Sequence, residues 1–219
     1  MSNSQPQHSS RYQLLEQELN RLRDHLLPPF EPTGLYSEEE YTRTLAYRVM
    51  AHAEFEAYFE DRVREIYRSA MDALEERGII SKVITCMIAF TSVEFDEIPT
   101  TKRPTQQNQL AKWDRKTKLS GKIAKCANHM HHVLENNHGI KEENLLKLLL
   151  PIGIEVDDID DTWLADMNSF GEERGSIAHT SGSIYRTRTL PDPKNENDKI
   201  MALLRGIADI DELIDRLAV

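Results

Sequence analysis

The chain has 219 residues, a formal net charge of −10, 29% charged residues, and only 9 glycines and 9 prolines. This composition favours a soluble helical protein of one domain, with or without an N-terminal extension, and the acidic balance argues against a protein that coats nucleic acid. A local basic face is still compatible with it.

The sequence carries no feature of an exported or membrane protein. No apolar run is long enough to cross a bilayer, and residues 1–6 lack the basic start and apolar core of a secretory signal. Two cysteines, Cys86 and Cys126, provide no disulfide framework. We therefore expect a cytoplasmic protein without a membrane partner.

The N-terminal part divides at residue 9. Residues 1–9 are polar and lack periodicity, which predicts disorder. From residue 10, apolar residues recur at helical spacing until Pro28 and Pro29 stop the pattern. We interpret residues 10–36 as a helix with a linker and residues 37–219 as the main helical domain.

A long helix is predicted after Ser37, because Ser37 and Glu40 have the spacing of a capping box. The helix should end at Arg77 and Gly78, a cation and a glycine that suit a helix C-terminus. Its expected apolar side consists of Leu45, Val49, Phe55, Phe59, Val63, Ile66, Tyr67, Ala70 and Leu74. Residues 79–90 fit a helix or a strand and we favour a helix, whereas residues 95–109, with two prolines, predict a loop.

A basic segment opens the next predicted helix, residues 111–135. Its charged and aromatic residues are Lys112, Trp113, Arg115, Lys116, Lys118, Lys122 and Lys125. In an acidic protein such a cluster suits the phosphate backbone of RNA, and Trp113 could stack on an unpaired base. The alternative is a solvated helix face with a tryptophan in the core.

The same helix contains residue types that bind metals: Cys126, His129, His131, His132 and His138. Spacings of three residues place some of them on one helical face. A closed zinc site takes four ligands, usually from two elements, and no second ligand pair with matching spacing is visible. We therefore favour histidines at a protein interface and expect no metal and no other cofactor.

The remaining segments complete an all-α pattern. Residues 142–150 predict a short leucine-rich helix ended by Pro151, and the acidic residues 157–161 suit the N-terminus of a following helix but lack the spacing of an EF-hand. Residues 181–197 predict a loop, and residues 199–217 an amphipathic helix. The expected fold is a bundle of about four main helices with accessory helices.

An arginine and a histidine follow an apolar run in residues 162–180. Trp163, Leu164, Met167 and Phe170 have near-helical spacing and predict a buried stripe. Arg174 then offers a permanently charged, forked donor that suits a phosphate, and His179 can exchange protons near neutral pH.

The spacing of these two residues constrains their geometry. Five residues of an ideal helix turn through about 140°, so Arg174 and His179 would not share one face. We therefore expect the helix to end between them, or a second copy of the chain to complete the site.

An arginine separated from a histidine by four residues, here with Ile177 and Ala178 before the histidine, resembles the signature of the HEPN superfamily. Residues 137–140 and 150–154 are similar to the RiboL-PSP-type branch, known from prokaryotic phage defence and RNA processing. The chain departs from the pattern at Gly175, where many catalytic members have Asn or Asp.

The resemblance implies a metal-independent endoribonuclease, in a phage-defence or toxin-antitoxin setting, that acts as a homodimer on RNA and has an antitoxin or sensor protein as a further partner. Arg174 and His179 would be catalytic, with Ser176 and Thr180 as auxiliary donors. Residues 51–56 resemble the early helix of this branch, whose acidic or polar side chain can face the Arg and His, which makes Glu54 a candidate for that role. The alternative for Glu54 is a solvated position.

Two other functions fit the same residues. A non-catalytic interaction module could use Arg174 and His179 to bind a nucleotide or a partner protein, and Gly175 and the acidic charge favour this reading. A purely structural helical dimer with a buried Arg-carboxylate pair requires no chemistry. No glycine-rich phosphate loop, nucleophile elbow or carboxylate pair with an adjacent base supports other enzyme classes.

Overall fold

The computed structural model describes residues 8–91, 115–179 and 190–219, and within these ranges the side chains of all but residues 115–120 and 176–179. Every regular element in these ranges is helical, which confirms the all-α prediction. The α-helices are α1 (Ser10–Leu26), α2 (Glu38–Arg77), α3 (Lys82–Phe90), α4 (Arg115–Glu135), α5 (Glu142–Leu149), α6 (Asp161–His179) and α8 (Pro193–Asp215); η2 (Leu150–Ile152) and η3 (Val156–Asp158) are 3₁₀-helices. No helix in these ranges combines the length and apolar character that a membrane span needs.

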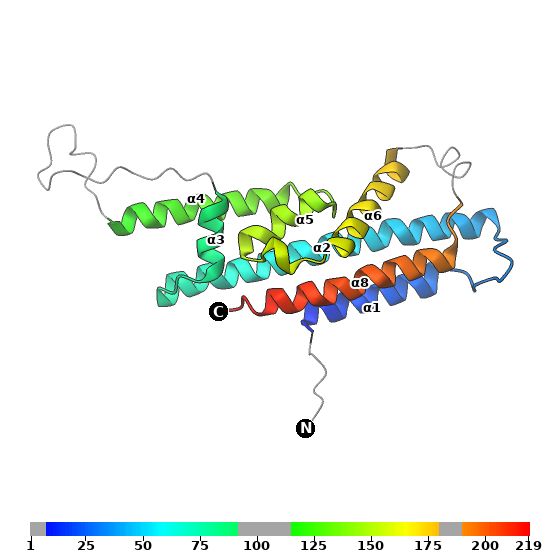
Figure 1. Cartoon of the computed structure of the whole chain (residues 1–219), viewed down its shortest axis with the longest axis horizontal. Helices are drawn as coiled ribbons and strands as arrows, with labels where there is room; N and C mark the ends of the chain where they lie inside the picture. Colours follow the sequence, from blue (N-terminus) through cyan, green and yellow to red (C-terminus); the bar gives the residue numbers. More distant parts are fainter. Residues whose placement is uncertain (1–7, 92–114, 180–189) are drawn as a thin grey trace, which may run out of the picture.

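The 40-residue helix α2 is the centre of the fold, with α1 and α8 along one side and α4, α5 and α6 on the other (Figure 1). The predicted capping box is present: the Ser37 amide donates to Glu40 Oε2 at 2.7 Å, and the Glu40 amide donates to Ser37 Oγ at 3.3 Å. Gly78 ends the helix with φ of 69°, a conformation that glycine adopts without strain. Both ends of α2 are therefore set by local residues.

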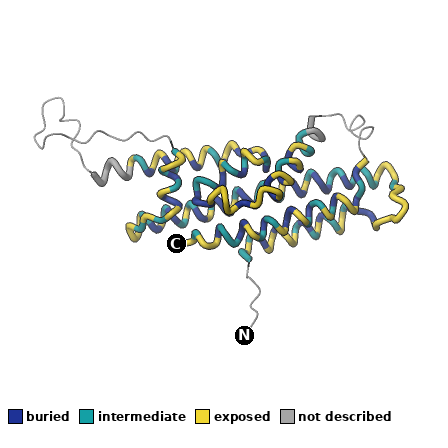
Figure 2. Tube along the Cα trace, in the orientation of Figure 1, coloured by how far each residue is buried: buried dark blue, intermediate teal, exposed yellow. Residues whose placement is uncertain are grey.

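Aromatic side chains of α2 form the middle of the core, which Figure 2 shows in dark blue along the inner faces of the helices. Tyr47, Phe55, Tyr58 and Phe59 have no exposed surface. The expected stripe is offset near its start, because Val49 is only half-buried. Tyr47 takes the inward position there, where its hydroxyl lies 3.4 Å from Asn197 Oδ1 of α8.

A buried carboxylate joins α1, α2 and α8. Asp211 has no exposed surface and accepts hydrogen bonds from Tyr58 Oη and Ser9 Oγ, both at 2.7 Å. Arg62 Nε lies 3.0 Å from the same carboxylate. Because Ser9 is the N-cap of α1, this network fastens the N-terminal helix to the domain core.

Two expected boundaries differ in the structure. Helix α8 begins at Pro193, so the prediction of a loop up to residue 197 is wrong. Asp192 caps the helix by accepting from the Asn195 amide at 2.8 Å, and Pro193 suits the first helical turn because it lacks an amide proton. Helix α5 ends at Leu149, one residue before its predicted end, and Pro151 follows in the 3₁₀-helix η2, in agreement with the prediction that this proline ends the helix.

Helix α6 packs against α8 at unusually short range. Gly206 of α8 faces the ring of Trp163, and a Cβ added there would lie 2.6 Å from Cγ and Nε1 of the indole. The indole Nε1 donates to the Leu203 carbonyl at 3.1 Å. The absence of a side chain at Gly206 therefore allows the first half of α6 to dock on α8.

Candidate functional site

Arg174 lies on α6 one turn beyond Phe170, a large side chain with no exposed surface. The Phe170 ring stacks on His52 of α2, with centroids 6.2 Å apart and an interplanar angle of 25°. It also meets the edge of Phe55 with centroids 5.9 Å apart. The packing of the predicted apolar stripe of α6 thus determines where along α2 the half-buried Arg174 lies.

Arg174 is close enough to His52 to change its ionisation. His52 has 2% of its surface exposed, and burial together with the positive charge of Arg174 lowers its pKa to about 4. Its ring is therefore uncharged at neutral pH. His52 Nδ1 has no hydrogen-bond partner among the described residues, and Glu56 Oε2 lies 3.6 Å from it.

Glu56 is the carboxylate of α2 whose pKa the Arg174 charge affects. Burial and the neighbouring Glu60 raise the pKa of Glu56, whereas Arg174 and His138 act in the opposite direction. Glu54 precedes Glu56 by two residues, which corresponds to about 200° around the helix. Its predicted contact with the Arg and His stays a prediction. His52 and Glu56 were missed in the sequence, although their i, i+4 spacing places them on one face.

The residue before Arg174 belongs to a cluster of four charged residues from three helices, which we call the ion cluster: Glu173, Arg48, Glu196 and Lys199. Lys199 Nζ of α8 lies 3.0 Å from both carboxylate oxygens of Glu173. Arg48 Nη1 of α2 lies 3.5 Å from Glu173 Oε2. Arg48 is buried and pairs with buried Glu196 of α8, to which its Nε donates at 2.7 Å. The cluster thus connects α6 to both neighbouring helices.

Of the two alternatives, a helix end between Arg174 and His179 is excluded, because α6 runs from Asp161 through His179. A second copy of the chain that completes the site stays a prediction. Gly175 lies within the helix, and a Cβ there would meet no described heavy atom within 4 Å. The two residues are about 140° apart around the helix axis, so one copy of α6 does not direct both to the same face. The side chains of Ser176 and His179 and the whole of Thr180 lie outside the described residues.

The basic segment is only partly described. Lys112 and Trp113 lie outside the described residues, and so do the side chains of Arg115, Lys116 and Lys118 at the start of α4. Lys122 is half-buried on this helix. Figure 1 shows the start of α4 at the opposite end of the molecule from the C-terminus of α6.

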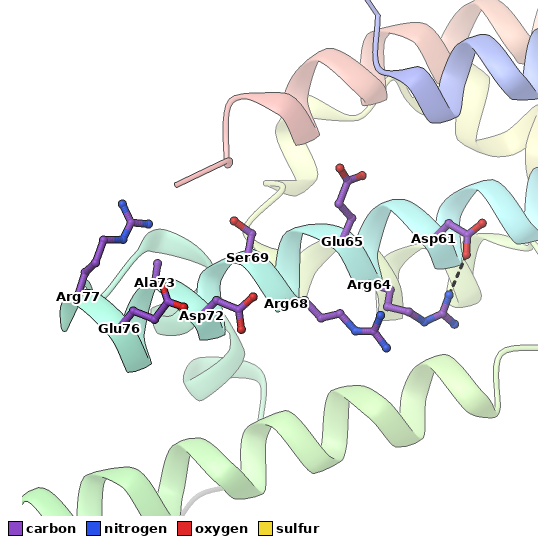
Figure 3. Close-up of a pocket in the computed structure, with 9 residues that line it drawn as sticks. All are labelled: Asp61, Arg64, Glu65, Arg68, Ser69, Asp72, Ala73, Glu76 and Arg77. Carbon is purple, nitrogen blue, oxygen red and sulfur yellow. Dashed lines mark hydrogen bonds and ion pairs between the residues drawn. The ribbon is translucent and has the colours of Figure 1, made fainter.

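The C-terminal half of α2 lines a hollow of about 600 Å³ (Figure 3). Its walls carry both signs of charge, and Arg64 Nη1 pairs with Asp61 Oδ1 at 2.8 Å. The lining residues are Asp61, Arg64, Glu65, Arg68, Ser69, Asp72, Ala73, Glu76 and Arg77. The hollow is open, some of its charges pair with each other, and its lining includes neither Arg174 nor His52 nor Glu56, so it is not assigned as the site.

Metal ligands do not converge in the described part of the chain. No group of three or more His, Cys, Asp or Glu side chains in residues 8–91, 121–175 and 190–219 has an arrangement that could hold a metal ion. On α4, Cys126 is buried and His129, His131 and His132 are exposed.

A family model described as RiboL-PSP-HEPN matches residues 10–216. Comparisons with curated proteins and with solved structures found no match. The match covers all of the helices from α1 to α8, including the N-terminal helix that Asp211 fastens to the core. The chain belongs to the RiboL-PSP-HEPN family, and the membership suggests a nuclease or another RNA-related module.

Proposed function

We propose that this member of the RiboL-PSP-HEPN family is a metal-independent endoribonuclease with Arg174 and His179 as its catalytic residues. The observation that carries the proposal is the family match over residues 10–216, within which this Arg and His occupy the end of α6. The position of Arg174 supports it, because a half-buried guanidinium beside an uncharged imidazole keeps its charge available for a phosphate.

The proposed reaction is a transesterification within RNA. His179 accepts the proton of a ribose 2′-hydroxyl, and that oxygen attacks the adjacent phosphorus. Arg174 stabilises the negative charge on the phosphoryl oxygens as it develops. The bond to the 5′-oxygen breaks and this oxygen takes up a proton, which leaves a 2′,3′-cyclic phosphate and a 5′-hydroxyl. DNA lacks the nucleophile and would not be cut.

The reaction needs a base for the 2′-hydroxyl and an acid for the leaving oxygen, both within hydrogen-bond reach. One copy of the motif supplies one histidine, whose position on α6 is about 140° around the helix axis from that of Arg174. A symmetric homodimer would bring a second His179 and a second Arg174 to the same site. We propose this composite site, with phage defence or a toxin-antitoxin system as its setting and an antitoxin or sensor protein as a further partner.

The direct test is cleavage of RNA by the purified protein in the presence of a chelator, with the ends of the products mapped. We expect cyclic phosphate and 5′-hydroxyl ends, and no cleavage of a substrate with a single 2′-deoxy substitution at the cut position. Arg174→Ala and His179→Ala should each abolish cleavage with unchanged helical content and melting temperature. Undiminished cleavage by either variant would disprove the catalytic assignment.

A second candidate function is a non-catalytic module that binds a nucleotide or a partner protein. Gly175 favours it, because the Asn or Asp found there in many catalytic relatives is missing, and so does the net charge of −10. Under this alternative the wild-type protein binds RNA or a nucleotide without cleaving it, and Arg174→Ala weakens the binding. Cleavage at mapped positions that depends on His179 would exclude it.

A further inference from the structure

Burial along α6 decreases from Phe170 to Gly175, the last residue of the helix whose side-chain position is described. Phe170 and Gly171 are buried, whereas Glu172 is exposed and residues 173–175 are half-buried. Figure 1 shows the C-terminal part of α6 rising away from the bundle, and Figure 2 shows the burial decreasing along it. Within the described side chains of α6, which end at Gly175, core burial thus extends to Gly171 and Arg174 lies beyond it.

At Glu173, the ion cluster connects α6 to α8 and α2. Lys199 Nζ of α8 donates hydrogen bonds to both carboxylate oxygens of Glu173, each at 3.0 Å. Arg48 Nη1 of α2 lies 3.5 Å from Glu173 Oε2. Arg48 itself is held, because its guanidinium pairs with Glu196 while both side chains are at least nine-tenths buried. A cation on each neighbouring helix thus meets the one carboxylate that directly precedes Arg174.

We infer that Glu173 and Lys199 are positioning residues that hold the α6 backbone so that Arg174 meets the phosphate, an inference that rests on the proposed ribonuclease function. Neither residue touches the reacting atoms. Their pair is more than a third exposed, and pairs of this kind contribute little to overall stability. Placement of a catalytic group is more sensitive, because a displacement of about 1 Å can lower a rate by about 100-fold.

The matched control lies on the same helix. Lys194 pairs with Asp198 at 2.6 Å near the start of α8, five residues before Lys199, and this pair does not involve α6. Lys199→Met and Lys194→Met each remove one positive charge and keep an unbranched side chain of similar length. A difference between them therefore reports the connection to Glu173 and not the loss of charge from α8.

The position of Arg174 can be measured without any enzymatic activity. The positive charge of Arg174 on α6 lowers the pKa of His52, and the Glu56 carboxylate lies 3.6 Å from His52 Nδ1. Titration of the His52 imidazole by NMR, assigned with His52→Gln, gives its pKa in the wild type and in Arg174→Met, Lys199→Met and Lys194→Met. We expect the pKa to rise in Arg174→Met, to move part of the way to that value in Lys199→Met, and to stay at the wild-type value in Lys194→Met.

Kinetics test the catalytic consequence. Lys199→Met and Glu173→Gln should lower kcat by about 10-fold or more with KM nearly unchanged, because the interaction acts on placement and not on RNA binding. Lys199→Arg should retain most of the activity, since it restores a cation opposite Glu173. Lys194→Met should match the wild type.

The two measurements separate the two proposals. A His52 pKa in Lys199→Met equal to that of the wild type would overturn the inference, and so would a shifted pKa with an unchanged kcat. If the wild-type protein does not cleave RNA, the proposed function fails, and the His52 titration alone decides whether the ion cluster places Arg174.

Discussion

Replacing Gly206 with alanine should destabilise this protein, although alanine is the better residue inside a helix. Alanine gains about 1 kcal/mol over glycine in an exposed helix interior. At Gly206, however, the added Cβ would lie 2.6 Å from Cγ of Trp163, whereas carbon atoms in contact prefer about 3.5–4.0 Å. Cδ1 of the indole would lie closer still, so the ring must move by about 1.5 Å away from α8.

The loss of unfolding free energy caused by this movement can be estimated from the contacts of Trp163. Overpacking of a core typically costs about 1–3 kcal/mol. The indole Nε1 would also lose its hydrogen bond to the Leu203 carbonyl, and a buried donor without a partner costs about 1–3 kcal/mol. After subtraction of the helix-propensity gain, a net loss of about 1–5 kcal/mol remains.

Urea and thermal unfolding followed by circular dichroism measure this loss, which should lower Tm by about 2–4 °C per kcal/mol for a chain of this size. Gly121→Ala is the control, because a Cβ at that position of α4 meets no described heavy atom within 4 Å and should stabilise by about 0.5–1 kcal/mol. In a Trp163→Leu background, Gly206→Ala should be almost neutral. If Gly206→Ala proved as stable as the wild type, the close docking of α6 on α8 would be refuted.

Three further predictions address the ionisation, assembly and RNA contacts of the proposed site. His52 has a folded-state pKa of about 4, below its ordinary value of 6.5, so the unfolded chain takes up the proton first as the pH falls, and the native state should lose up to about 3 kcal/mol between pH 6.5 and 4. The difference in unfolding free energy between wild type and His52→Gln should therefore shrink over this range, and a pH-independent difference would contradict the burial of His52. Light scattering at micromolar concentration should give about twice the 25.3 kDa chain mass, and a monomer that cleaves RNA at full rate at every dilution would rule out the composite site. Changing Lys116, Lys118 and Lys122 together to Glu should weaken RNA binding and flatten its dependence on salt, because fewer counterions are released; an unchanged slope would assign these lysines to a solvated face.

Local sequence determined the ends of several helices. The Ser37 and Glu40 capping box and the glycine after Arg77 act over three or four residues, so the bounds of α2 could be predicted from the residues themselves. The same local signal was available at Asp192 and Pro193, but the polar composition of the segment was given more weight, and the start of α8 was placed too late. The apolar spacing from Trp163 to Phe170 correctly predicted the buried face of α6.

The family and its motif could also be recognised from sequence, because a short pattern of residue types identifies them without knowledge of their neighbours. The match over residues 10–216 confirms the HEPN resemblance. The continuation of α6 through Gly175 could not be predicted in this way. A single glycine lowers helix propensity by only about 1 kcal/mol, and the surrounding turns decide whether the helix continues.

The surroundings of Arg174 were decided by tertiary structure alone. His52 and Glu56 are more than a hundred positions away in the chain, and nothing local distinguishes them from the charged residues beside them on α2. Glu54 has the same chemistry as Glu56, and only the rotation of α2 against α6 determines which carboxylate lies near the guanidinium. The low pKa of His52 has the same origin, because the sequence specifies an imidazole and the packing of Phe170 and its neighbours removes the water that would stabilise its charge.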